Sequence, residues 1–229
     1  MRVVVATANP HKLAEIARLV DADALGVTLI PMGELGVPSP VEDGDTFAAN
    51  ALIKARACAA ATGLPAIADD SGIAVDTLGG EPGVRSARFA GEGADDAANN
   101  LLLLVRLAAA GADTPAARRG AFVCAAALAL PDGTTHVEHG RMEGHVVDGP
   151  RGTEGFGYDP LFVADATADG RTNGQLAPAE KDAISHRASA FAALAPHLAA
   201  ALSGLTRGRA APSDSPPASP SDSPPDLSR

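Results

Sequence analysis

The chain has 229 residues, of which 46% are apolar and 3% aromatic, and its formal net charge is −10. This length is enough for one substantial buried core, and the apolar fraction is ordinary for a globular protein. The negative charge argues against nucleic-acid polymers and anionic membranes as partners, because both need a basic face on the protein. A small phosphorylated ligand, which needs only a few local cations, is still allowed.

Two features favour a cytoplasmic enzyme. Cys58 and Cys124 are the only cysteines, and each lies among small apolar residues, which favours buried reduced thiols over a disulfide or a metal site. The N-terminal apolar run meets Asn9-Pro10 at once, so it lacks the length and flanks of a signal peptide. No uninterrupted apolar stretch reaches the roughly 18 residues of a membrane span.

The predicted elements alternate between strand and helix. Val3 to Thr7 is typical of a buried strand, and a helix follows with Asn9 as candidate N-cap and Pro10 in its first turn. The next predicted elements are a strand over Val27 to Ile30, a helix over Thr46 to Thr62 stopped by Gly63, a strand over Pro65 to Ala68 and a helix over Asp95 to Ala110.

The C-terminal half contains a predicted hairpin. Ala121 to Leu130 and Thr135 to Met142 flank the turn signal Pro131-Asp132-Gly133-Thr134. A short strand over Pro160 to Val163 and a helix over Ser185 to Leu202 follow. Strands mixed with helices, including a hairpin, predict an α/β fold whose sheet is not purely parallel.

We expect one domain over residues 1–206. From Arg207 onward the composition changes to Pro, Ser and Asp, with almost no apolar residue. Such a segment buries too little surface to offset the entropy of ordering it, so residues 207–229 are predicted to be a disordered tail.

Adjacent carboxylates mark the first candidate site. Asp69 and Asp70 end an apolar strand-like run and are followed by Ser71 and Gly72. Successive side chains of a strand point to opposite faces, which predicts that one carboxylate is structural and the other reactive. Gly72 is expected to provide a sharp exit from the strand. An ordinary turn rich in Asp, Ser and Gly is the alternative.

Two segments could bind phosphate and metal. Thr7-Ala8-Asn9-Pro10-His11-Lys12 lies at a strand-to-helix junction, where free N–H groups favour an anion, although a simple capped helix would look the same. Ahead of the next long helix, Asp45 is a candidate N-cap, whereas Glu42 lies outside that role and could hold Mg²⁺ together with Asp70. Asn50 and Lys54 share one helical face, from which they could meet phosphate oxygens or solvent.

Aromatic and basic residues form the remaining candidates. Phe156 and Tyr158, separated by glycine, suit a stacking platform for a nucleobase, with core packing as the alternative. Lys181 and Ser185-His186-Arg187 gather hydrogen-bond donors at the start of the last helix. Arg85 and Arg88 lie in a glycine-flanked loop, and we interpret them as bracing that loop.

Taken in this order, the motifs resemble the inosine/xanthosine triphosphate pyrophosphatase family from about Val3 to Leu202. The matching segments are Thr7-x-Asn9-x-x-Lys12, Thr46-Phe47-x-x-Asn50-Ala51-x-x-Lys54-Ala55, Ala68-Asp69-Asp70-Ser71-Gly72, Phe156-Gly157-Tyr158-Asp159-Pro160 and Ser185-His186-Arg187. Ala49 departs from the pattern, since the family usually has Glu there, and this shifts the expected metal role to Glu42.

The resemblance implies an elongated mixed sheet flanked by helices, two lobes with a central active-site cleft, Mg²⁺ and a homodimer. The implied reaction is hydrolysis of the deaminated purine nucleotides ITP, dITP and XTP to the monophosphate and pyrophosphate. By position, Asp70 would accept the proton, and Glu42 and Asp70 would bind the metal. The implied substrate-binding residues are Thr7, Ala8, Asn9, Pro10, His11, Lys12, Lys54, Ser71, Phe156, Gly157, Tyr158, Asp159, Lys181, His186 and Arg187.

Base selectivity can be argued in part from the donors. His186 and Arg187 would donate hydrogen bonds to a 6-oxo group, whereas the amino group of adenine would leave these donors unpaired. Guanine also has a 6-oxo group, so this argument does not explain its rejection. Two other functions compete: a Maf-like pyrophosphatase, which would typically begin with Ser-Pro-Arg-Arg in place of Asn9-Pro10-His11-Lys12, and a purine-sensing module, which would leave Glu42 and Asp70 without a role.

Overall fold

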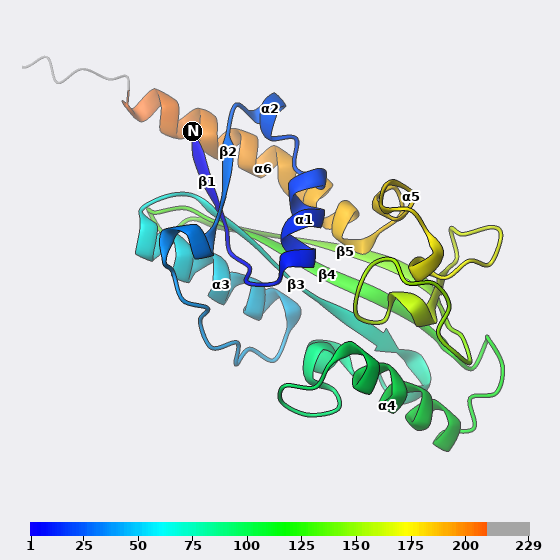
Figure 1. The fold of residues 1–229 in the computed structure, drawn as a ribbon. Helices are drawn as coiled ribbons and strands as arrows, with labels where there is room; N and C mark the ends of the chain where they lie inside the picture. The colour runs from blue at the N-terminus through cyan, green and yellow to red at the C-terminus, as the bar shows by residue number, and fades with distance from the viewer. Residues whose placement is uncertain (210–229) are drawn as a thin grey trace, which may run out of the picture.

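The computed structural model describes residues 1–209, where a six-stranded sheet has helices on both faces (Figure 1). The strands are β1 (Arg2–Val5), β2 (Thr28–Pro31), β3 (Ala66–Val75), β4 (Arg119–Ala129), β5 (Thr135–Val146) and β6 (Phe162–Ala164). The α-helices are α1 (Pro10–Leu19), α2 (Ala22–Leu25), α3 (Phe47–Thr62), α4 (Asp96–Ala109), α5 (Pro178–Asp182) and α6 (His186–Arg209). The 3-10 helices are η1 (Met32–Leu35), η2 (Asp76–Leu78), η3 (Gly83–Arg88), η4 (Asp159–Leu161) and η5 (Asn173–Gln175).

The sheet is mixed, as predicted. Its order is β2-β1-β3-β4-β5-β6, with β1 parallel to both neighbours and the pairs from β3 to β6 antiparallel. The hairpin prediction is confirmed, although β4 begins at Arg119 and ends at Ala129, and β5 continues beyond Met142 to Val146. α6 continues to Arg209. The rest of the predicted tail, residues 210–229, lies outside the described part of the chain.

Three core clusters hold the molecule together. On one face of the sheet, α1 and α6 pack against β1, β3 and β4 through residues such as Ile16, Leu128 and Leu194. On the other face lies α3, whose small residues, such as Ala51, pack against Ala125 and its neighbours. The third cluster joins the far ends of the long strands to α4 (Figure 1). Burying each large aliphatic side chain stabilises the fold by about 1.5–3 kcal/mol.

β3 differs from the prediction. It does not end at the Asp69–Asp70 pair but runs through it to Val75, so the expected sharp exit at Gly72 is wrong. Gly72 instead allows η3 to lie close to the strand. An added Cβ at Gly72 would lie 2.3 Å from Ser86 Oγ and 2.6 Å from the Gly83 carbonyl oxygen of η3. A glycine that suggests a turn in the sequence therefore allows a 3-10 helix to pack on the strand.

Helix termini are close to the prediction. Asn9 caps α1, and Gly63 ends α3 in a left-handed conformation with φ +64°. At the start of α3 the cap is Thr46, whose hydroxyl accepts from the Ala49 amide at 3.1 Å, so the assignment of Asp45 is corrected. Pro160 belongs to η4, and the strand predicted there begins only at Phe162.

The last helix is unusually apolar. By length and composition alone, its segment His186–Leu205 could cross a membrane. Its buried residues Ala190, Phe191, Leu194, Leu198 and Leu202 belong to the core cluster that also contains the first strand. One face of this helix therefore packs on the core of the fold.

Candidate active site

A cavity of about 590 Å³ lies beside the middle of β3. β1 pairs with β3 only at Val4↔Ala66 and Val5↔Ile67, so further along, no strand of residues 1–209 pairs with this edge of β3. Side chains from both faces of the sheet can therefore reach one space. The predicted site residues that line it are Thr7, Ala8, Asn9, Lys12, Glu42, Lys54, Asp70, Ser71, Phe156, Gly157, Tyr158, Asp159, Lys181, His186 and Arg187.

Asp69 and Asp70 have separate environments, as the strand period predicts. Asp69 is fully buried, with its Oδ2 atom 3.2 Å from Lys12 Nζ and 2.9 Å from Arg187 Nη2. Burial alone would raise the pKa of Asp69, but the charges of Lys12 and Arg187 hold it well below its usual range. This carboxylate is consequently ionised and joins two cations that line the cavity.

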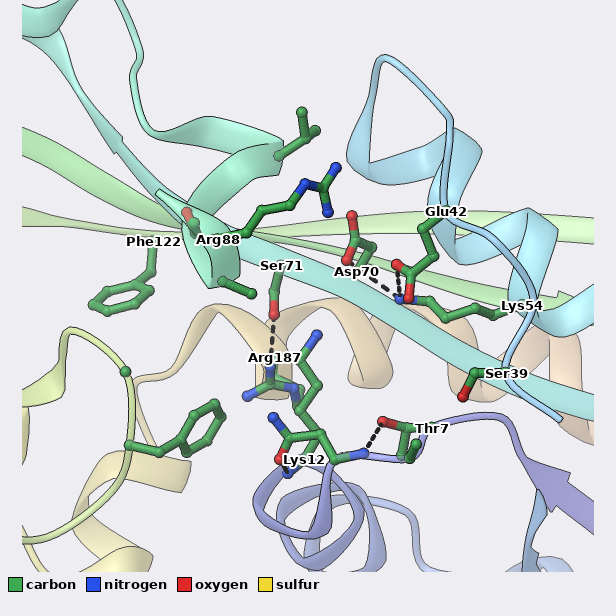
Figure 2. A pocket seen from close by; sticks show the side chains of 18 of the residues that line it. Thr7, Lys12, Ser39, Glu42, Lys54, Asp70, Ser71, Arg88, Phe122 and Arg187 are labelled. Carbon is green, nitrogen blue, oxygen red and sulfur yellow. Dashed lines mark hydrogen bonds and ion pairs between the residues drawn. The ribbon is translucent and has the colours of Figure 1, made fainter. Parts of the chain in front are cut away.

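Asp70 faces α3 and the cavity (Figure 2). Lys54 Nζ lies 3.2 Å from Asp70 Oδ1 and 2.7 Å from Glu42 Oε2, and the Asn50 amide donates to Asp70 Oδ2 at 3.2 Å. Burial raises the pKa of Asp70, the Lys54 and Lys12 charges oppose this, and Glu42 adds to the rise. Asp70 is thus the carboxylate of the pair with the higher proton affinity.

Lys54 is a buried cation between carboxylates. Desolvation disfavours its charged form, but the nearby charges of Asp70, Asp69 and Glu42 outweigh desolvation and raise its pKa. The carboxylates of Glu42 and Asp70 thus both face the Lys54 ammonium. Their hard oxygen atoms are the type of ligand that Mg²⁺ prefers.

The strand-to-helix junction is a capped helix with a cation beside it. Asn9 Oδ1 accepts from the amides of His11 at 2.9 Å and Lys12 at 3.2 Å, and the Asn9 amide donates to Thr7 Oγ1 at 3.1 Å. The Asn9 side chain therefore occupies two of the free amides at the start of α1. The Lys12 side chain is then the main positively charged group that this junction presents to the cavity. Pro10 and His11 do not line the cavity, although the His11 ring stacks on Phe156 with centroids 5.3 Å apart.

The two rings of the aromatic motif have different surroundings. Phe156 lies at the cavity with Lys181 Nζ 5.1 Å and Arg187 Cζ 5.8 Å from its ring centroid. Tyr158 is buried in the third core cluster, where its hydroxyl donates to the Ser86 carbonyl at 2.8 Å. Phe156 is therefore the more exposed ring of this motif at the cavity, where it already contacts His11 and two cations, and Tyr158 anchors the loop.

His186 and Arg187 are buried at the start of α6. Desolvation, aided by the charges of Arg187 and Lys181, lowers the pKa of His186 well below its usual value, so the ring is neutral at pH 7. His186 stacks on Phe122 at 5.0 Å, and its Nδ1 atom has no hydrogen-bond partner within the described residues. Arg187 donates to Ser71 Oγ at 2.7 Å and contacts Asp69 and Glu15.

Several residues of the site were not predicted from the sequence. Glu15 is buried and accepts from Lys181 at 2.8 Å and from Arg187, so it supports two of the cavity cations. Its place one turn after Lys12 on α1 was the available signal. Arg88 lines the cavity, with its side chain directed toward Asp70 in Figure 2, although we interpreted it as bracing the loop. Ser39 and Phe122, from a loop and a strand without a motif, also line it.

Comparison with known proteins identifies the family. The Ham1 family model matches residues 3–197. The chain belongs to the Ham1 family. Ham1 relatives named dITP/XTP pyrophosphatase include one from Frankia alni, 55% identical over 85% of this chain and 96% of that protein. Another, from Streptomyces avermitilis, is 50% identical over 85% of this chain and 96% of that protein.

Solved Ham1 structures have the same fold. A HAM1 protein from Coxiella burnetii superposes with a TM-score of 0.74 at 40% identity, over 90% of this chain and 99% of that one. A nucleoside-triphosphatase / dITP/XTP pyrophosphatase from Mycobacterium abscessus gives a TM-score of 0.67 at 46% identity, over 86% of this chain and 100% of that one. The predicted family and its mixed, helix-flanked sheet are therefore confirmed.

Proposed function

We propose that this Ham1 protein hydrolyses dITP, ITP and XTP to the nucleoside monophosphate and pyrophosphate. The observation that carries the proposal is the Glu42–Lys54–Asp70 cluster, which lies in one cavity with Lys12 and a ring available for stacking. A nucleoside triphosphate needs cations for its phosphates and a flat apolar surface for its base, and this cavity offers both. Names of relatives at about half identity support the same substrates.

We further propose that the enzyme depends on Mg²⁺. Glu42 and Asp70 would hold the ion, because their oxygens converge on the Lys54 ammonium, a position that already accommodates positive charge. When bound, Mg²⁺ would neutralise charge on the phosphate oxygens and on the two carboxylates. Waters and phosphates would complete its coordination.

The side chains of the chain suit hydrolysis at the α-phosphorus. Asp70, whose carboxylate faces the cavity, would orient the attacking water and accept its proton, and Asn50 would keep the carboxylate oriented. Lys12 and Lys54 would bind phosphate oxygens and stabilise charge that develops there. Product formation then requires only that this water be positioned in line with the leaving pyrophosphate.

Base selection would occur at the opposite wall. His186 and Arg187 line this wall, His186 with a neutral ring and Arg187 always charged, so both could donate to a 6-oxo group. An adenine amino group would leave buried donors unpaired, at a cost that reaches about 10⁴-fold in sites built for a hydrogen bond.

The decisive experiment measures pyrophosphate release from ITP, ATP and GTP, each with and without Mg²⁺, for wild type and Asp70→Asn. We expect fast release from ITP alone, only with Mg²⁺, and almost none from folded Asp70→Asn. Asp43→Asn, an exposed neighbour of Glu42, is the matched control and should retain wild-type activity. Full activity of Asp70→Asn would remove Asp70 from the mechanism, and absence of release from every nucleotide would favour a binding module.

Assembly and location are proposed on the family resemblance and the composition. We propose a homodimer, which light scattering after size-exclusion chromatography would detect as twice the 22.8 kDa chain mass. We propose a cytoplasmic location, supported by buried free thiols at Cys58 and Cys124. Cell fractionation would test it, and recovery with the membrane fraction would contradict it.

A further inference from the structure

α4 holds the backbone of the loop that carries Phe156. The Gly157 amide donates to Asp96 Oδ2 at 2.6 Å, and Asn100 Nδ2 donates to the Gly157 carbonyl at 3.0 Å. Residues 96 and 100 are four apart, so both side chains leave the same face of the helix. Both the backbone amide and the backbone carbonyl of Gly157 are thus bound by α4.

This loop is otherwise costly to order. Gly155 and Gly157 have φ angles of +74° and +61°, in the left-handed region, and glycine loses more conformational freedom on ordering than any other residue. The backbone amide of Phe156 itself donates to Asp159 Oδ2 at 2.9 Å. The Phe156 ring, half-buried at the cavity, is therefore fixed from two directions, one of which is α4.

We propose that Asp96 and Asn100 are positioning residues for the base end of the nucleotide: by holding Gly157, they fix the Phe156 ring against which the purine stacks. This inference rests on the proposed function. Asp96 lines the cavity beside Gly157, and α4 packs in the third core cluster, whereas α3, which carries Lys54, packs in another. α4 accordingly prepares the site for the base without taking part in hydrolysis.

The inference predicts a split between the two ends of the substrate. Loss of one hydrogen bond of this kind changes an equilibrium about 5- to 10-fold. Asp96→Ala and Asn100→Ala should each raise the KM for dITP and the Kd for dIMP by about this factor, with kcat within about twofold of wild type. Inhibition by pyrophosphate, which has no base, should be unchanged. Because both residues hold the same Gly157, the double variant should lose less than the product of the two single effects.

Two controls separate positioning from general stability. Asp96→Asn keeps an oxygen that can accept from the Gly157 amide, so it should restore most of the dIMP affinity. Leu107→Ala removes a fully buried side chain near the other end of α4, in the third core cluster. It should lower Tm while leaving the KM for dITP unchanged.

Isothermal titration calorimetry with dIMP and steady-state kinetics with dITP would test the positioning role of Asp96 and Asn100. Unchanged dIMP affinity in folded Asp96→Ala and Asn100→Ala would overturn the inference, as would an equal rise in KM for Leu107→Ala. If Asp96→Ala does not fold, Asn100→Ala alone gives the test. Failure of the proposed function would look different, because wild type itself would then release no pyrophosphate from dITP.

Discussion

Asp69 and Asp70 are adjacent in β3 but have opposite electrostatic surroundings. Cations hold the pKa of Asp69 low, whereas burial raises that of Asp70. The two-residue period of a strand predicts this division. The partners were not predictable, because Lys12 and Arg187 reach Asp69 from helices at opposite ends of the chain.

Asp69→Asn should destabilise the fold strongly. Removing this carboxylate leaves Lys12 and the buried Arg187 without their shared partner, and breaking a buried pair on one side costs about 3–5 kcal/mol. Urea unfolding followed by circular dichroism would measure the loss. Asp43→Asn, at an exposed position, should change stability little. A loss below about 1 kcal/mol for Asp69→Asn would contradict the assigned structural role.

His186 should make stability depend on pH. Its folded pKa lies below its unfolded value near 6.5, so below that pH the unfolded state binds a proton that the folded state does not. The free energy of unfolding then falls as pH drops through the unfolded pKa, by up to about 1.4 kcal/mol per pH unit. His145, whose pKa is also lowered by burial, contributes in the same direction.

Urea unfolding of wild type and His186→Gln at several pH values between roughly 5 and 8 would isolate this contribution. The variant should lose stability less steeply below pH 6.5. Equal slopes for the two proteins would mean that His186 is protonated in the folded state.

At the scale of elements, close approaches between backbones decide where the site residues lie. The sequence predicted caps, the hairpin and most element types, because these follow from local spacing. It did not predict that β3 continues through Gly72, since contact with η3, which comes later in the chain, determines the use of that glycine. Packing overrode the local turn signal.

Gly140→Ala should displace the first turn of α6. An added Cβ at Gly140 of β5 would lie 1.9 Å from the His186 carbonyl oxygen and 2.6 Å from the Ala190 amide. Backbone atoms cannot yield as a flexible side chain does, so the helix must shift and carry His186 and Arg187 with it. We expect lower stability and a higher KM for dITP. Gly133→Ala, at the open hairpin turn with φ +91°, should lower stability alone. An unchanged KM in Gly140→Ala would contradict this coupling.

For the whole molecule, the motifs identified the cavity walls but not how they meet. Glu15, Ser39, Arg88 and Phe122 join the site only because separate segments converge beside the unpaired edge of β3. Such convergence depends on strand order and on where β1 ends, which local periodicity does not encode. Within residues 1–209, the long strands β3, β4 and β5 connect all of these walls.

The same strands predict that the protein unfolds in one step. β3 places Ile67 in the cluster under α6 and Ile73 in the cluster under α4, and β4 does the same with Leu128 and Phe122. Neither of these two core clusters can come apart without disrupting strands that also belong to the other. Tyr158, the one tyrosine in a chain without tryptophan, reports on the α4 cluster, whereas far-UV circular dichroism reports on the whole. Their urea transitions should coincide, and an earlier tyrosine transition would mean that the α4 cluster unfolds alone.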